Sequence, residues 1–202
     1  MMKTPFETGF RISSPYGSRV DPITGKAGAF HAGVDLVGND RIVRSVMDGY
    51  VLRSRIVTDP NNLTSEWGNY VSVMGDDGKI IYYCHLEQRY VADGERVTAG
   101  KPLGVEGATG KATGIHLHFE VRNTAGSTLD PCEYLGIPNR VGYEYKPEPS
   151  YISQSSEWAK DAVAWAVEKG ILKGRGGDDW DLQSPITREE MCVMLYRARE
   201  VL

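Results

Sequence analysis

The sequence predicts a mainly β protein in which an antiparallel-sheet domain precedes a small α-helical module. Its 202 residues include 23 glycines, a frequency that favours turns and short strands. Short β-favouring runs are separated by turn residues until about residue 137, and helical patterns replace them further on. These observations divide the chain into a first domain at 1–138, a linker at 139–156 and a helical module at 157–202.

Four strands are expected in the first domain. They cover the runs 49–52, 70–74 and 79–84 and the alternating positions Ile115, Leu117, Phe119 and Val121. Residues 75–78 read Gly-Asp-Asp-Gly, the composition of a hairpin turn. We therefore expect the second and third strands to pair antiparallel, and the alternating set of the fourth to pack inward.

The linker and the first helix follow from a change of composition. Residues 139–156 contain Pro147 and Pro149 and no periodic apolar face. A helix is expected over 156–169, where apolar residues recur at helical spacing until Gly170.

A second helix is expected after Thr187. Thr187 and Glu190 have the S/T-x-x-E form of a capping box, which marks a helix start. An apolar stripe at helical spacing follows at Met191, Met194, Leu195 and Ala198.

Charge and composition exclude several classes of protein. The net charge of −4 argues against a nucleic-acid or anionic-membrane partner, and no apolar run approaches the roughly 18 residues of a membrane span. The N-terminus shows no apolar signal region, so we expect the protein to act where it is made, to leave by another route or to have lost a leader. Cys84, Cys132 and Cys192 are expected to be free, mostly buried thiols.

The four histidines carry the candidate chemistry. His116 and His118 lie two residues apart on the fourth expected strand, so they share a face with Glu120 and Arg122. Two imidazoles on one open face suit a metal ion, and a solvated polar face is the alternative.

A second motif joins His31 and Asp35. Four residues of straight strand would place them about 13 Å apart, too far for one metal ion. Gly33 between them allows the backbone to bend, although a plain turn before a strand is the alternative. Two histidines and one aspartate would leave an open fourth position, as at catalytic zinc, and the other two histidines would suit proton transfer and oxyanion stabilisation.

These motifs resemble those of the lysostaphin/LytM-type zinc endopeptidases of peptidoglycan, over roughly residues 10–137. The matching segments, in chain order, are Ser13-Ser14-Pro15-Tyr16-Gly17-Ser18-Arg19, His31-x-Gly33-Val34-Asp35, Asp48-Gly49-Tyr50-Val51, Gly68-Asn69-Tyr70-Val71, Tyr83-x-His85-Leu86, Gly94-x-x-Val97-x-x-Gly100-x-x-Leu103-Gly104, Thr109-Gly110 and Thr113-Gly114-Ile115-His116-Leu117-His118-Phe119-Glu120-Val121. The resemblance implies an antiparallel-sheet metallopeptidase domain that holds one Zn²⁺ per chain.

The same resemblance assigns roles to residues. It implies that His31, Asp35 and His118 are the zinc ligands, and that His85 and His116 are catalytic histidines beside the metal. Ile115 replaces a common proline and Ile81 a usual threonine, but neither position offers a ligand.

Tyr16 and Arg19 precede the first expected ligand. They are candidate substrate-binding residues, and a packed tyrosine with a surface arginine is the alternative.

The helical module resembles a single S-layer homology (SLH) repeat. The matching residues are Trp158-Ala159, Ala162, Trp165-Ala166, Gly170-Ile171, Gly174, Pro185-Ile186-Thr187-Arg188-x-Glu190 and Met194-Leu195-Tyr196-Arg197. Such repeats bind anionic secondary polymers of Gram-positive walls, and Arg188 at a helix N-terminus suits an anion. The alternative is that Thr187 and Glu190 only cap the helix while Arg188 is solvated.

A module of about fifty residues is too small to be comfortably stable alone. We therefore expect it to pack on a partner, either the same module of another chain, which gives a homo-oligomer, or its own catalytic domain.

The leading functional hypothesis is a zinc-dependent endopeptidase that cuts the stem or cross-bridge of peptidoglycan. A non-catalytic LytM-like regulator or wall-binding scaffold is the alternative, although such relatives typically lose ligands. A zinc D,D-carboxypeptidase of the related type would carry a glutamate where this chain has Thr113. The two-module layout favours a phage or prophage endolysin, made in the cytoplasm and acting at a Gram-positive wall, ahead of a secreted autolysin. The bond that is cut stays open.

Overall fold

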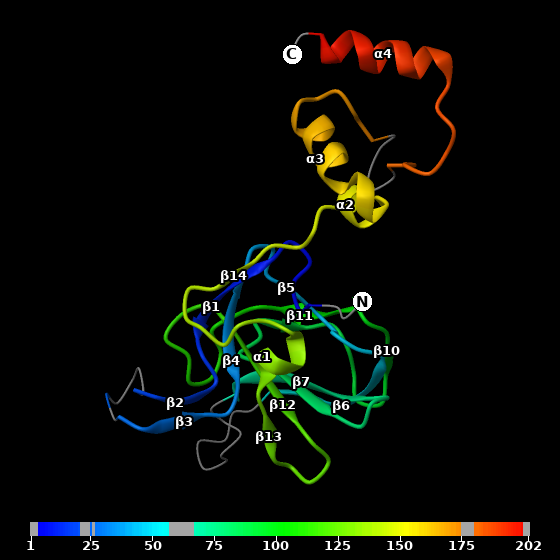
Figure 1. Ribbon diagram of the computed structural model, residues 1–202. Coiled ribbons are helices and arrows are strands. Elements are labelled where there is room, and N and C mark those ends of the chain that lie inside the picture. Colours follow the sequence, from blue (N-terminus) through cyan, green and yellow to red (C-terminus); the bar gives the residue numbers. More distant parts are fainter. Residues whose placement is uncertain (1–3, 21–24, 26, 57–66, 175–179, 200–202) are drawn as a thin grey trace. The chain divides into compact units, whose positions relative to one another are not determined.

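The protein is described by a computed structural model that covers all residues except 1–3, 21–24, 26, 57–66, 175–179 and 200–202. The chain divides into two compact units, Met1–Pro147 and Glu148–Leu202 (Figure 1). Strands build the first unit, and the helices α2 (Ser150–Ser153), α3 (Lys160–Glu168) and α4 (Arg188–Ala198) belong to the second.

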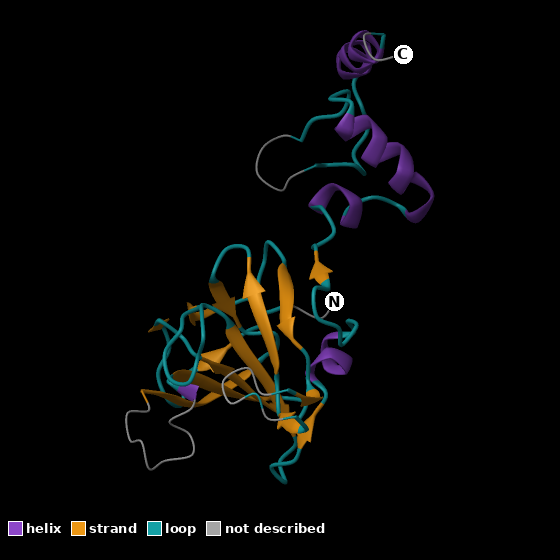
Figure 2. Ribbon diagram, turned by 90° about the vertical axis from the view of Figure 1, so that its left-hand side faces the viewer, coloured by secondary structure: helices purple, strands orange, loops and turns teal. Residues whose placement is uncertain are grey.

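The first unit is built on a nine-stranded antiparallel sheet (Figure 2). Its strands, in spatial order, are β10 (Arg96–Val97), β6 (Gly49–Ile56), β7 (Asn69–Gly75), β8 (Ile80–Cys84), β12 (Leu117–Arg122), β4 (Val34–Gly38), β1 (Phe10–Ser14) and β14 (Glu144–Tyr145), and β13 (Thr128–Leu129) also pairs with β12. A smaller sheet has the order β5 (Ile42–Arg44), β11 (Pro102–Val105), β9 (Gln88–Arg89). A third pairs β2 (Gly17–Arg19) with β3 (Ala29–His31), and the short helix α1 (Pro131–Leu135) follows β13.

The mainly β, antiparallel fold predicted from the sequence is confirmed. The four expected strands correspond to β6, β7, β8 and β12, and β7 pairs antiparallel with β8 across the predicted turn. One detail is wrong: β12 begins only at Leu117, and Ile115 is 50% exposed instead of packed inward. The chain leaves the ladder there, because His116 makes only an isolated bridge to Gly107.

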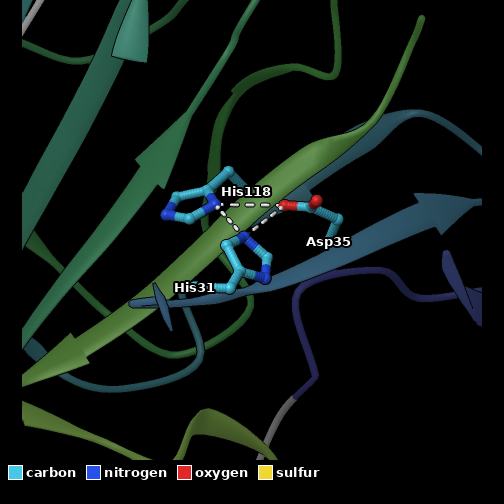
Figure 3. Close-up of side chains that lie close together, drawn as sticks. All are labelled: His31, Asp35 and His118. Carbon is cyan, nitrogen blue, oxygen red and sulfur yellow. Dashed lines mark hydrogen bonds and ion pairs between the residues drawn. The ribbon is translucent and has the colours of Figure 1, made fainter. Parts of the chain in front are cut away.

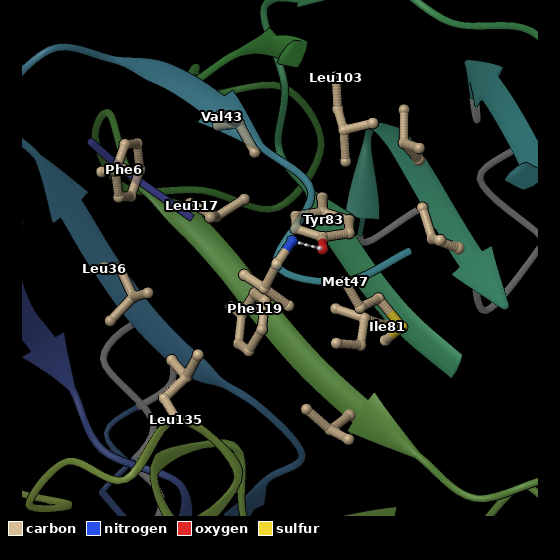
Figure 4. Packing of buried hydrophobic residues seen from close by; sticks show 14 of the residues in the cluster. Phe6, Leu36, Val43, Met47, Ile81, Tyr83, Leu103, Leu117, Phe119 and Leu135 are labelled. Atoms are coloured by element: carbon tan, nitrogen blue, oxygen red, sulfur yellow. Dashed lines mark hydrogen bonds between the residues drawn. The ribbon is translucent and has the colours of Figure 1, made fainter. Parts of the chain in front are cut away.

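The hydrophobic core joins the large sheet to the three-stranded sheet (Figure 4). Phe119 and Tyr83 come from the large sheet, and Val43 and Leu103 come from β5 and β11; all four are fully buried. The Tyr83 hydroxyl accepts a hydrogen bond from the backbone N–H of Val46 at 3.0 Å, so the buried ring also has its polar atom satisfied. Packing in this core fixes the positions of β4 and β12.

Part of the segment 139–156, expected as a linker, has regular structure. β14 pairs with β1, and the rings of Phe10 and Tyr145 stack with centroids 5.2 Å apart. A two-residue strand is too short to leave a period in the sequence, so the pattern could not reveal it.

The two helices predicted in the module are present as α3 and α4. Thr187 Oγ1 accepts from the N–H of Glu190 at 3.1 Å and the Glu190 carboxylate accepts from the N–H of Thr187 at 2.8 Å, so the predicted capping box forms. The second unit has very few buried residues. Among those that the structure describes, Ile171 alone is buried. Trp158, before α3, is 89% exposed and Leu195, on α4, is 65% exposed.

Two smaller expectations can be compared directly. Within the described parts of the chain, no helix is long and apolar enough to cross a membrane. All three cysteines are free; Cys84 and Cys132 are buried, whereas Cys192 is exposed on α4.

Glu106 is a buried carboxyl group that the sequence did not mark. Its Oε1 accepts from the N–H of Gly38 at 3.1 Å, while Oε2 has no hydrogen-bond partner among the described residues. Burial raises the pKa of Glu106 from 4.5 to about 7.

The contribution of Glu106 to the stability of the first unit should therefore fall as pH rises. A carboxyl group whose pKa is raised by folding adds stability below its unfolded value of 4.5 and loses it as pH passes about 7. We expect Glu106→Gln to remove about 3 kcal/mol of this dependence, at about 1.4 kcal/mol per pKa unit. Urea unfolding at pH 5 and pH 8 measures it, with the exposed Glu144→Gln as the control. An equal pH dependence in wild type and Glu106→Gln would contradict it.

Candidate metal centre

Three side chains from three strands meet at one point (Figure 3): His31 at the end of β3, Asp35 on β4 and His118 on β12. β12 pairs antiparallel with β4 so that His118 lies directly opposite Asp35. His118 Nδ1 lies 3.0 Å from Asp35 Oδ1, and His31 Nε2 lies 3.0 Å from His118 Nδ1 and 3.2 Å from Asp35 Oδ1. We call these three residues the metal triplet.

Each imidazole of the metal triplet has one nitrogen bound elsewhere. His31 Nδ1 donates to the carbonyl oxygen of Pro15 at 2.7 Å, and His118 Nε2 donates to Glu120 Oε2 at 3.4 Å. The other nitrogen of each ring faces the common point. Outer hydrogen bonds of this kind fix the tautomer and the orientation of histidines that bind metals.

The electrostatics of the triplet favour a bound cation. Burial alone would raise the pKa of Asp35, but hydrogen bonds from His118 and His31 hold it well below its usual range. Burial would likewise lower the pKa of His118, but the carboxylates of Asp35 and Glu120 raise it to about 9. The pocket thus stabilises positive charge at the point where the three donor atoms converge.

The backbone bends at residues 32 and 33, as the sequence predicted, and brings His31 and Asp35 together. The φ of Gly33 lies outside the left-handed region, so the bend alone does not require glycine there. A Cβ at this position would lie 2.7 Å from His118 Cε1 and 2.7 Å from the carbonyl oxygen of Phe119. Gly33 therefore makes room for the His118 ring and for the backbone of β12.

Gly33→Ala should disturb the triplet without removing a ligand. Because one of the contacts is backbone, the clash cannot be relieved by a side chain alone, and we expect a loss of about 1–3 kcal/mol together with weaker metal binding. Gly114→Ala is the matched control, since a Cβ there meets nothing within 4 Å. Thermal unfolding and metal titration of both variants check this; wild-type metal affinity in Gly33→Ala would show that the space is not required.

The two remaining histidines lie beside the triplet. The rings of His85 and His116 have centroids 4.8 Å apart, and the His85 ring lies 5.8 Å from that of His118. His116 Nε2 is 3.7 Å from Asp35 Oδ1, while its Nδ1 donates to the carbonyl oxygen of Gly114 at 2.9 Å. All four histidines of the chain therefore gather at one site.

His85 is held in an unusual conformation. Its φ of 66° is left-handed, which is uncommon for a residue other than glycine and is typical of functional sites. Its N–H donates to the carbonyl oxygen of Trp67 at 2.8 Å, and its Nδ1 donates to that of Thr109 at 2.8 Å. Burial, with the nearby His118 and His116, lowers the pKa of His85 to about 4, so Nε2 is an unprotonated acceptor at neutral pH.

Residues 29–131, just over half of the 202-residue chain, match the family described as Peptidase family M23. This chain belongs to peptidase family M23. The resemblance read from the motifs is thereby confirmed, and residues 152–179 match the S-layer homology domain.

Known M23 relatives agree with this assignment. The peptidoglycan DD-endopeptidase ShyC of Vibrio cholerae serotype O1 is 38% identical over 112 residues, which are 54% of this chain and 24% of ShyC. The catalytic domain of lysostaphin from Staphylococcus simulans is 28% identical with a TM-score of 0.53, covering 63% of this chain and 92% of that domain. A zinc-containing peptidase from Vibrio cholerae is 26% identical with a TM-score of 0.51, covering 64% of this chain and 39% of that one. The chain spans only 24% to 30% of the length of the first curated relatives it matches.

Arg19 is the last residue of β2, and Tyr16 lies directly before this strand. Arg19 Nη1 lies 3.4 Å from Asp35 Oδ2 and also donates to Ser14, so its guanidinium contacts the outer oxygen of a triplet carboxylate. The Tyr16 hydroxyl is 3.3 Å from Thr128 Oγ1, and its ring packs edge-on against the exposed Phe30. A role in substrate binding stays a prediction for both.

Arg188 lies outside the M23 domain, at the first position of α4, and it is exposed. The SLH-like module therefore presents this guanidinium beside the free N–H groups of a helix start.

Glu120 and Arg122 lie beside the metal triplet, and the sequence did not predict a role for either of them there. Alternation placed them on the face of His118, but that face was expected to be open, whereas Glu120 is 1% exposed. Arg122 Nε donates to Glu120 Oε1 at 2.6 Å. The available signal was a pair of opposite charges two and four residues after a predicted ligand.

Proposed function

We propose that this protein is a zinc-dependent endopeptidase that hydrolyses peptide bonds in the stem or cross-bridge of bacterial peptidoglycan. The observation that carries the proposal is the spacing of the metal triplet. Ligand atoms bound to a tetrahedral zinc at about 2.0–2.1 Å lie roughly 3.3 Å apart. The three donor atoms here are separated by 3.0, 3.0 and 3.2 Å, so two nitrogens and one oxygen already fit one small ion.

Zinc, when bound by His31, Asp35 and His118, would polarise the scissile carbonyl and lower the pKa of a water molecule. The chain's own residues would move the protons. His85 Nε2 is the unprotonated acceptor for a proton of the attacking water, because Nδ1 is committed to Thr109. His116, whose ring lies 4.8 Å from that of His85 and whose Nδ1 is committed to Gly114, would orient the water with Nε2 as acceptor or, as an imidazolium, donate from Nε2 to the developing oxyanion.

Two alternatives need an experiment. A non-catalytic LytM-like regulator or scaffold would bind walls without cutting them. A D,D-carboxypeptidase would release only a terminal residue, although Thr113 stands where the related type carries its glutamate base.

Digestion of purified walls distinguishes the proposed endopeptidase from these two alternatives. The full chain, loaded with one equivalent of zinc, is incubated with walls from several Gram-positive species, and new termini are identified by mass spectrometry. New internal amino termini support an endopeptidase and name the bond. Release of a single terminal residue would support the carboxypeptidase, and intact walls in every case would overturn the proposal.

We also propose that the SLH-like module directs the enzyme to an anionic polymer of a Gram-positive wall, as in an endolysin made in the cytoplasm. The match over residues 152–179 and the exposed Arg188 at the α4 N-terminus support this. Binding to walls before and after chemical removal of their secondary polymers tests it. Arg188→Gln should weaken binding to intact walls only; equal binding to stripped walls would contradict the proposal.

A homo-oligomer through the module is the third part of the proposal. Seven large apolar side chains among the described residues of the module are exposed: Trp158, Trp165, Ile186, Met191, Val193, Leu195 and Tyr196. The module also has an apolar cavity of about 560 Å³, bordered by residues such as Ile171, Leu182 and Val193. An exposed tryptophan and an apolar cavity on one module suit a second copy as the occupant. Residues 148–202 carry ten acidic and seven basic side chains, a net charge of −3, so the repulsion between two copies is modest.

Light scattering tests the oligomer. The full chain should form an oligomer, whereas a chain ending after Pro147, whose core is complete without the module, should be monomeric. Trp158→Ser should weaken the association. A monomeric full-length protein would overturn this part of the proposal.

A further inference from the structure

The buried carboxylate behind His118 has two opposed contacts. Glu120 Oε2 accepts from His118 Nε2 at 3.4 Å, and Glu120 Oε1 accepts from Arg122 Nε at 2.6 Å. Its side chain is 1% exposed, whereas that of Arg122 is 27% exposed. Glu120 thus joins a triplet histidine to an arginine at the edge of the site.

Arg122 is itself fixed by aromatic rings. Its guanidinium carbon lies 5.3 Å from the ring centre of Trp67 and 5.0 Å from that of Tyr82. These two rings contact each other, with centroids 4.9 Å apart. Cation–π contacts to two faces restrict the direction of the guanidinium more than a salt bridge alone would.

The arrangement is not explained by stability. A buried ion pair loses about as much by desolvation as it gains by attraction, and apolar residues of similar volume often serve as well. What the pair supplies is a fixed orientation of the Glu120 carboxylate. Arg122 holds one of its oxygens, so the other oxygen stays in place to accept from His118 Nε2.

We propose that Arg122, fixed by Trp67 and Tyr82, is a positioning residue that orients Glu120 and through it keeps His118 Nδ1 turned toward the metal. The proposal rests on the zinc site proposed above. It also assigns a double role to Trp67, whose backbone carbonyl accepts from the N–H of His85 while its ring contacts Arg122. One aromatic residue then supports a candidate ligand and a candidate catalytic histidine.

The chain offers a matched control for this unit. Arg96 donates twice to Asp76, at 2.8 and 2.6 Å, and its guanidinium lies 4.8 Å from the ring centre of Tyr50. The chemistry is the same as in the Arg122 unit, but the pair is exposed and lies on β10 and the 75–78 turn.

The test measures zinc affinity by competition with a chelator, and the visible absorption of the Co²⁺-loaded protein, in the full chain. We expect Arg122→Gln and Glu120→Gln to weaken zinc binding by about 10–100-fold, the range for loss of an outer partner of a metal ligand. Their Co²⁺ spectra should change in band position. Arg96→Gln should match wild type within about twofold in both measurements.

Misfolding is controlled by the double variant Glu120→Gln/Arg122→Gln, which removes both charges. Its thermal midpoint should return close to that of wild type, while its zinc affinity stays about 10-fold lower. Restored affinity in the double variant, or wild-type affinity in Arg122→Gln, would overturn the inference. If wild type itself bound no zinc, the proposed function would fail instead.

Discussion

Asp35→Ala and His118→Ala are expected to lose zinc binding and wall lysis together. Each substitution leaves two protein donors where catalytic zinc sites use three, and each also removes a partner of the other ligands. Asp35 contacts both imidazoles and Arg19, so its loss also removes the carboxylate that these three side chains share. We expect a loss of activity of about 10³-fold or more, as when a member of a cooperating catalytic set is removed.

Metal analysis beside a turbidity assay on walls measures both effects. Asp93→Ala, an exposed carboxylate paired with Arg55, is the control and should change neither zinc content nor lysis. Stoichiometric zinc in a folded His118→Ala protein would show that the triplet is not the metal site.

The fold was largely predictable because local patterns carried it. The β7–β8 hairpin rests on a Gly-rich turn between two β-favouring runs, and α4 rests on a capping box. What the sequence could not show were the short pairings fixed by distant contacts, such as β14 against β1. Two-residue strands have no period, and only the packing of Tyr145 on Phe10 makes the pairing visible.

The site was predictable as a set of residues but not as a geometry. His31, Asp35 and His118 were named from motifs, while the reason they meet is the register that places His118 opposite Asp35. The sequence did not predict the surroundings of the triplet. Gly33 leaves space for the His118 ring, and Glu120 is buried rather than solvated. A sequence gives the face on which a side chain lies, but not what covers that face.

In the module, the sequence predicted the helices but not the exposure of their apolar residues. Helical periodicity predicted α3 and α4, yet half of the apolar stripe on α4 is exposed: Met191 is 50% and Leu195 is 65% exposed, while Met194 and Ala198 are half-buried. Periodicity states only that a face is apolar. It does not state whether the covering surface belongs to the same chain.

His85 and His116 should behave differently from the triplet, because the geometry places them beside the common point and not on it. We expect His85→Ala and His116→Ala to retain zinc and to lose about 10²–10⁴-fold in activity, the range for loss of a general acid or base. His116 has one nitrogen near Asp35 and the other on Gly114, so neither contact requires it to hold the ion.

His85 needs a second variant, because its φ of 66° makes alanine strained there. Asparagine tolerates the left-handed region and its amide can still reach the Thr109 carbonyl, but it lacks the imidazole acceptor. His85→Asn should therefore keep the thermal midpoint and zinc of the wild type and still lose activity, which separates proton transfer from backbone strain. Release of zinc from folded His116→Ala, or full activity in His85→Asn, would show that the division into ligands and catalytic histidines is wrong.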